Sequence, residues 1–148
     1  MRAKVLNLQW QTETENAMQT VEIHLLIAAI AVISSALVCY TVGVWGERLQ
    51  HGLRLWHVVF FLLGIAADIT GTTLMEHIAR LTHAHDRIHT ITGAIAVVLM
   101  LIHAVWAVAT YFRGSERARR RFSRFSVAVW CIWLIPYGIG VYIGMTMH

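Results

Sequence analysis

The sequence of 148 residues has little charge, a single proline and few cysteines. Asp, Glu, Lys and Arg together make up only 14% of it, whereas water-soluble domains usually contain about 25%. The two cysteines, Cys39 and Cys131, each lie inside an apolar stretch, so no disulfide framework is indicated. This composition excludes disordered, collagen-like and disulfide-stapled classes. It predicts a chain that sits mostly in lipid.

Hydrophobic residues make up 57% of the chain and gather in four blocks, each long enough to cross a bilayer as a helix. The blocks span about 21–45, 55–79, 88–112 and 125–146, after a polar tail at 1–20 that we expect to be mobile or interfacial. The short linkers force neighbouring helices to run antiparallel. We therefore predict an all-α integral membrane protein, with one four-helix up-down bundle over 21–148.

The first block has the position of a secretory signal, but its acidic flank, its length and the lack of a small-x-small site favour a retained helix. Eight of the twelve basic residues lie in the stretches between spans one and two and between spans three and four. The positive-inside rule places these stretches in the cytoplasm of a bacterial inner membrane, with both termini outside. The net charge of +4 then reflects topology and contact with anionic lipid, and not nucleic acid.

Ionisable residues at membrane depth are the candidates for function, because lipid tolerates them only when they are paired, ligated or solvated. His89 and His103 are 14 residues apart, which places them on one helix face and about 21 Å apart along the axis. Gly93 lies on the same stripe. Two stacked b-type haems in a membrane bundle need this arrangement, with a glycine that admits the porphyrin. No CxxCH motif occurs, so any haem would be non-covalent.

Each haem needs a second axial ligand at the same depth. Counting from the arginine-rich side, His24 and His77 come within reach of His89. His57 is the candidate partner of His103, although the count leaves their depths about 10 Å apart. The second haem is therefore the weaker inference.

Asp68 is the most costly residue in the sequence, since it lies about 21 Å into the membrane. Its carboxyl group would be tolerated in lipid if it were protonated, accepted a hydrogen bond from Thr72, or paired with a cation across the bundle. By depth the nearest candidate is His103. An Asp68–His103 pair would tune an axial imidazole, carry a proton toward quinol, or co-ligate a metal ion. We treat Asp68 as the candidate catalytic residue.

The connection between spans two and three holds four histidines and an aspartate, His77, His83, His85, Asp86 and His89. Zinc or copper ligands come in such residue types, but only His85 and His89 have a ligand spacing. A metal site in this loop is a minor alternative.

Five segments resemble the HsmA family of small four-span bacterial membrane proteins, over nearly all of the chain after the tail. They are Trp56-His57, the run 68–75 (Asp-Ile-Thr-Gly-Thr-Thr-Leu-Met), the run 89–93, the run 99–107, and Phe125-Ser126 through Trp130, Trp133, Pro136 and Tyr137. The resemblance implies the four-span fold and conveys no settled activity. A broader likeness to haem b bundles is one of structure alone.

Three functions follow from these residues. The first is a membrane b-type haem protein that transfers electrons within or across the membrane, an oxidoreductase if it is an enzyme. It has no flavin or nucleotide motif, so its electrons come from quinol or a partner. The second is a transporter or channel for protons, a metal ion or haem, which uses Asp68 and the intramembrane histidines and needs a homodimer for a pore. The third is a small subunit of a larger complex.

Overall fold

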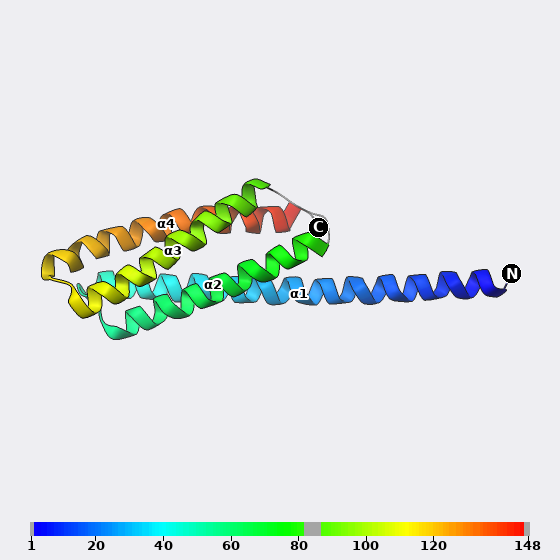
Figure 1. The fold of residues 1–148 in the computed structure, drawn as a ribbon, viewed down its shortest axis with the longest axis horizontal. Helices are drawn as coiled ribbons and strands as arrows, with labels where there is room; N and C mark the ends of the chain where they lie inside the picture. The colour runs from blue at the N-terminus through cyan, green and yellow to red at the C-terminus, as the bar shows by residue number, and fades with distance from the viewer. Residues whose placement is uncertain (1, 82–86, 147–148) are drawn as a thin grey trace.

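Four long apolar helices pack antiparallel in the computed structural model, which describes residues 2–81 and 87–146. They are α1 (Arg2–Leu49), α2 (Leu55–Leu81), α3 (Arg87–Arg113) and α4 (Glu116–Thr146). Each contains a segment long and apolar enough to cross a membrane. Figure 1 shows the α1–α2 and α3–α4 turns at one end, which we call the arginine-rich end. The predicted four-helix membrane bundle is confirmed.

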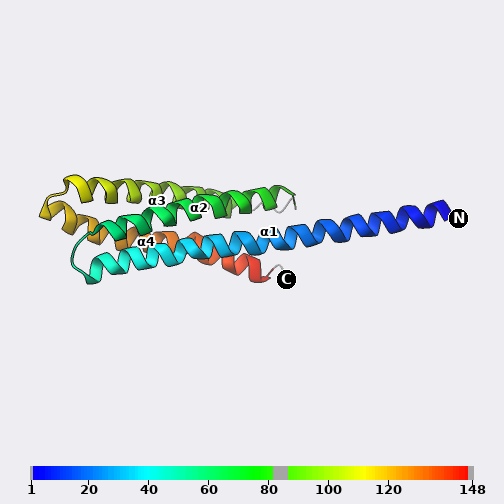
Figure 2. The same ribbon diagram turned by 90° about the horizontal axis from the view of Figure 1, so that it is seen from below.

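The predicted polar tail is helical and continues into the first span. α1 runs unbroken for 48 residues, and Figures 1 and 2 both show its N-terminal part extending alone beyond the other helices. No glycine or proline interrupts the chain before Gly43, so nothing in the sequence stops the helix. The hydroxyls of Thr14 and Thr20 donate to carbonyls one turn back. Residues 11–20 are all exposed.

α4 begins nine residues before the predicted fourth span, so most of the arginine run is helix and not loop. Ser115 caps the helix, because its Oγ accepts a hydrogen bond from the Ala118 amide at 3.3 Å. Phe122 lies within the run and is fully buried. The arginines on the other faces of the helix can therefore stay exposed. Because the segment is so highly charged, its charge alone suggested a loop.

α1 and α2 pack closely because glycines leave room for residues of the facing helix. Three contacts align the two helices: Phe61 lies at Gly43, Gly64 at Tyr40, and Gly71 at Ile33. A Cβ atom at Gly64 would lie 2.5 Å from Cε1 of Tyr40. Since no side chain fits in that space, glycine at this position permits the close approach of the helices.

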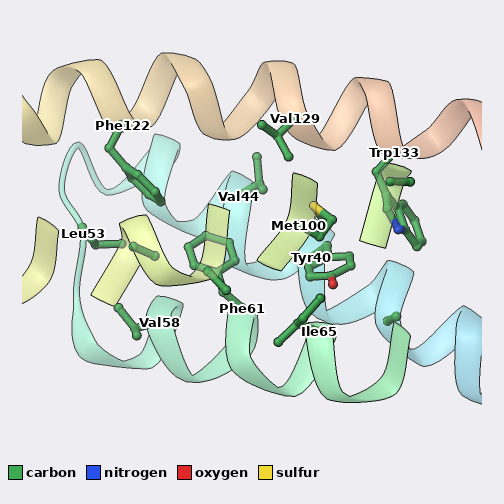
Figure 3. Close-up of a cluster of buried hydrophobic side chains, with 14 residues drawn as sticks. Tyr40, Val44, Leu53, Val58, Phe61, Ile65, Met100, Phe122, Val129 and Trp133 are labelled. Atoms are coloured by element: carbon green, nitrogen blue, oxygen red, sulfur yellow. The ribbon is translucent and has the colours of Figure 1, made fainter. Parts of the chain in front are cut away.

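The hydrophobic core occupies the half of the bundle nearest the arginine-rich end. Figure 3 shows Leu53 and Phe122 near the α1–α2 turn, followed by Phe61 and then by Tyr40, Met100 and Trp133. Beyond these residues α2 and α3 diverge toward Leu81 and Arg87 (Figure 1). The buried hydrophobic cluster therefore lies mainly in one half of the bundle, and the second part is the half in which α2 and α3 diverge. We call the second part the open half.

Candidate functional site

Asp68 is buried at the boundary between the two halves and is held by two side chains, Tyr40 from α1 and Trp133 from α4. Only 2% of its surface is exposed. The Tyr40 hydroxyl donates to Asp68 Oδ2 at 3.3 Å, and Trp133 Nε1 donates to the same oxygen at 2.9 Å. The two donor rings meet edge to face, with centroids 5.2 Å apart. We call these three residues the Asp68 cluster.

The sequence explains how the cluster forms. Gly64 lies one helical turn before Asp68 and leaves the space that the Tyr40 ring occupies. One edge of the phenol ring therefore packs against α2, with its hydroxyl beside the carboxylate. Because a buried carboxyl without hydrogen bonds is strongly destabilising, both donors stabilise the position of α2 in the bundle.

His103 belongs to a separate group near the arginine-rich end. It is fully buried, and its Nε2 lies 2.9 Å from Oγ of Ser126. Its ring stacks on Phe122 at 5.2 Å and 8°, and the edge of Phe61 meets it at 4.6 Å. Nδ1 is buried and has no hydrogen-bond partner within the described residues. The imidazole is thus enclosed by aromatic rings.

The structure does not bring Asp68 and His103 together. Phe61 lies opposite His103, and Asp68 follows Phe61 by seven residues on α2. Seven residues correspond to about 10 Å along the helix. The predicted pair is replaced by bonds from α1 and α4, which sequence depth alone did not reveal. Among the described residues, Tyr40 and Trp133 donate the hydrogen bonds to Asp68, and the predicted donor Thr72 does not.

His57 is fully buried at the start of α2. Its Nδ1 accepts a hydrogen bond from the Arg54 amide at 2.9 Å, so the side chain caps its own helix. It precedes Phe61 by four residues, which places it about 6 Å from the level of His103. The offset is smaller than the sequence count predicted, but the Phe61 ring contacts His103 from the α2 side.

His89 lies in the open half, and its ring packs against α4. Its Cε1 is 3.0 Å from the position of a Cβ atom at Gly140. The ring is half-buried, and Nδ1 is buried with no hydrogen bond to any described residue. One turn along α3, Gly93 would meet no described atom within 4 Å of an added Cβ. His89 therefore has an unsatisfied nitrogen beside an open glycine face.

The two predicted partners of His89 lie on exposed surface. His77 is exposed and is nine residues from Asp68, on the opposite face of α2. His24 is exposed on α1. The residue of α2 that matches His89 in depth is Met75, because each is 14 residues from the Phe61–His103 contact. Met75 shares the inward stripe with Asp68 and is half-buried.

Three residues of the predicted loop metal site, His83, His85 and Asp86, lie outside the described residues. Within 2–81 and 87–146, no group of three His, Cys, Asp or Glu side chains is placed to hold a metal ion.

Sequence reasoning missed the partners of the buried groups. Tyr40 and Trp133 supply the donors to Asp68, and Ser126 bonds His103. A signal was present, since Tyr40 and Trp133 lie inside their predicted spans, five and eight residues from the nearer end, and not at the ends where the aromatic belts are expected. Such rings need a polar partner when buried.

Comparison with known proteins adds no relative. No protein-family model, curated protein or solved structure matches this chain. The resemblance to the HsmA family stays a prediction, and the function must be argued from the residues described above.

Proposed function

We propose that this four-span protein binds one b-type haem non-covalently in the open half of the bundle and transfers electrons within the membrane. The observation that carries the proposal is His89, whose buried Nδ1 has no hydrogen bond among the described residues. Gly93 beside it offers a face without neighbours. Iron ligation satisfies an imidazole nitrogen, and a glycine face accepts a flat ring. Bound haem would supply one-electron redox chemistry.

The chain's own residues set the position of the ligand. Gly140 allows the His89 ring to lie against α4, since a side chain there would contact Cε1. On α2, Met75 is at the same level and on the inward stripe. We therefore propose that Met75, in place of His24 or His77, would hold the haem iron together with His89. A histidine–methionine pair raises the potential of haem iron relative to two histidines.

The packing around His103, near the arginine-rich end, favours one bound haem over two. To ligate iron through Nε2, His103 would have to give up its bond to Ser126 and its stacking on Phe122. An imidazole held in this way by Ser126 and enclosed by two aromatic rings acts as a core residue. We assign His103 and His57 to the stability of the bundle.

The proposed topology follows the charges at the two ends. The arginine-rich end lies in the cytoplasm of a bacterial inner membrane and both termini lie outside, by the positive-inside rule. His89 is then in the outer half. No nucleotide motif occurs in the sequence, and quinol in the bilayer is the proposed electron donor.

Absorption spectra of the detergent-purified protein, oxidised and reduced with dithionite, test the proposal together with haem content per chain. We expect about one low-spin haem, lost in His89→Ala. The matched controls are His77→Ala, on the exposed face of α2, and His103→Phe, near the arginine-rich end; both keep the haem. Met75→Leu keeps the fold and changes the spectrum. A protein that stays colourless when haem is added back would refute the proposal, as would a full haem content in His89→Ala.

The Asp68 cluster favours a second candidate, transport of a proton, a metal ion or haem. Asp68 is an acid held deep in the bundle, and such residues commonly mark ion paths. Four helices leave little room for a pore, so this function would use a homodimer. In reconstituted vesicles, Asp68→Asn would abolish flux while the exposed Glu13→Gln on α1 would not. Equal flux in the wild type and Asp68→Asn would exclude this candidate.

A further inference from the structure

A basic hollow of about 560 Å³ lies at the arginine-rich end, where the last turn of α1 meets the first turns of α4. Six of the ionisable side chains that line it define the hollow for the argument below: Arg48 and His51 near the end of α1, Arg119, Arg120 and Arg124 on α4, and Glu47. None of them belongs to the Asp68 cluster or to the proposed haem site. The hollow therefore needs its own explanation.

The four guanidinium groups are not neutralised by the acids around them. Among the described residues, no Arg of the hollow forms an ion pair within 4.0 Å, and the one such pair joins Arg80 to Glu76 near the other end of the bundle. Glu47 and Glu116 are the two acids that line the hollow, so its formal charge is +2. Guanidinium groups placed together without partners favour a bound anion, and phosphate oxygens match their donor geometry.

Glu47 gives the hollow a second property. It is only 2% exposed, and its Oε2 is buried with no hydrogen bond to a described residue. A buried carboxylate oxygen without a donor is destabilising, and a ligand that brings a hydroxyl would satisfy it. The hollow thus offers cations for an anion and, beside them, an acceptor for a hydrogen-bond donor.

The backbone at the end of α1 holds these side chains in a strained turn. The Gly52 amide donates to the Glu47 carbonyl at 3.3 Å, and the His51 amide donates to the Arg48 carbonyl at 3.4 Å. These two bonds form a Schellman cap. Its left-handed position, usually glycine, is His51 with φ of 51°. His51 thus occupies a position that favours glycine, and it lines the hollow.

The depth of the hollow points to a lipid. Two exposed apolar residues of α1, Trp45 at 41% and Leu49 at 74%, flank in sequence the residues Glu47 and Arg48 that line it. Exposed tryptophan at the end of a span marks the headgroup level of a bilayer. A phosphate at this level belongs to a phospholipid, while a free phosphate would have to enter from the aqueous side.

We propose that the basic hollow binds the phosphodiester headgroup of an anionic phospholipid whose headgroup carries hydroxyls, such as phosphatidylglycerol. The arginines bind the phosphate oxygens, and Glu47 accepts a hydrogen bond from a headgroup hydroxyl. The site does not depend on haem binding.

Native mass spectrometry of the full-length protein in non-ionic detergent, with short-chain lipids added, measures the binding. We expect phosphatidylglycerol to bind in preference to phosphatidylcholine. Arg119→Gln, half-buried in the hollow, should weaken it about tenfold, the usual effect of losing one charge-assisted bond. The matched control Arg121→Gln removes the same charge from an exposed position on α4 that does not line the hollow. It should leave binding within about twofold.

Two further comparisons sharpen the test. Glu47→Met, which has no carboxyl or amide oxygen to accept the bond, should remove the preference for phosphatidylglycerol over phosphatidic acid, which lacks the glycerol hydroxyls of that headgroup. Arg120 is exposed, so Arg120→Gln should weaken lipid binding as Arg119→Gln does, even if Arg119→Gln folds poorly. Equal losses in Arg119→Gln, Arg120→Gln and Arg121→Gln would overturn the site in favour of diffuse attraction. Competition by inorganic phosphate or glycerol phosphate at the lipid's own concentration would overturn the lipid assignment.

Discussion

Replacement of Gly64 by alanine tests whether the close approach of α1 and α2 is set by the Tyr40 ring. The added Cβ would lie 2.5 Å from Cε1 and 2.6 Å from Cδ1 of Tyr40. The ring cannot move freely, because Tyr40 is fully buried, meets Trp133 edge to face and donates to Asp68. Either the helices separate or the hydrogen bond to Asp68 is lost.

The expected magnitude follows from two opposing terms. Overfilling a packed interior costs about 1–3 kcal/mol. Alanine gains about 1 kcal/mol over glycine in a helix. Gly138→Ala is the matched control, since an added Cβ there meets no described atom within 4 Å. It should gain the helix propensity of alanine without the cost of overfilling. We therefore expect Gly64→Ala to be less stable than Gly138→Ala by about 1–3 kcal/mol.

Reversible unfolding in mixed micelles, followed by circular dichroism, measures the difference. A double-mutant cycle with Tyr40→Ala isolates the contact, because Gly64→Ala should cost nothing once the ring is gone. If Gly64→Ala were as stable as Gly138→Ala, the ring would not limit the helix spacing. If the cost persisted without the Tyr40 ring, the reasoning would fail in the same way.

Three other substitutions test the buried polar groups and the cap by the same unfolding measurement. Ser126→Ala leaves both nitrogens of His103 without a hydrogen bond and should cost about 1–3 kcal/mol; an unchanged stability would show that the bond contributes nothing. Trp133→Phe removes the shorter bond to Asp68 and should cost a similar amount, with the ring packing largely retained. His51→Gly relieves the positive φ and should raise stability by up to about 1 kcal/mol; a loss of stability would mean that the side chain holds the turn.

The spans were predictable because length and apolar composition decide whether a helix can cross a bilayer. α2 and α3 match the predicted blocks to within two residues. The ends of α1 and α4 were not predictable in the same way. The tail and the arginine run are polar, and a count of apolar residues cannot tell a polar helix from a polar loop.

The candidate site was predicted only in part. Sequence singled out Asp68 and His103 as residues that need partners in lipid, and both are buried and hydrogen-bonded. Asp68 and His103 were predicted to pair with each other because depth in the membrane was the only position that the sequence supplied. Their real partners come from other helices, at positions where the sequence shows only aromatic residues and a serine.

Sequence by itself determined that this protein crosses the membrane four times, since hydrophobicity and linker length are local properties of the chain. It also determined which residues could not be left unpaired in lipid. Only the tertiary structure decided the pairs, because they depend on helix alignment: glycines such as Gly64 admit rings and so set which residues of α1, α2 and α4 share a level. The same alignment placed Glu47 among arginines that are about 70 residues away in the chain.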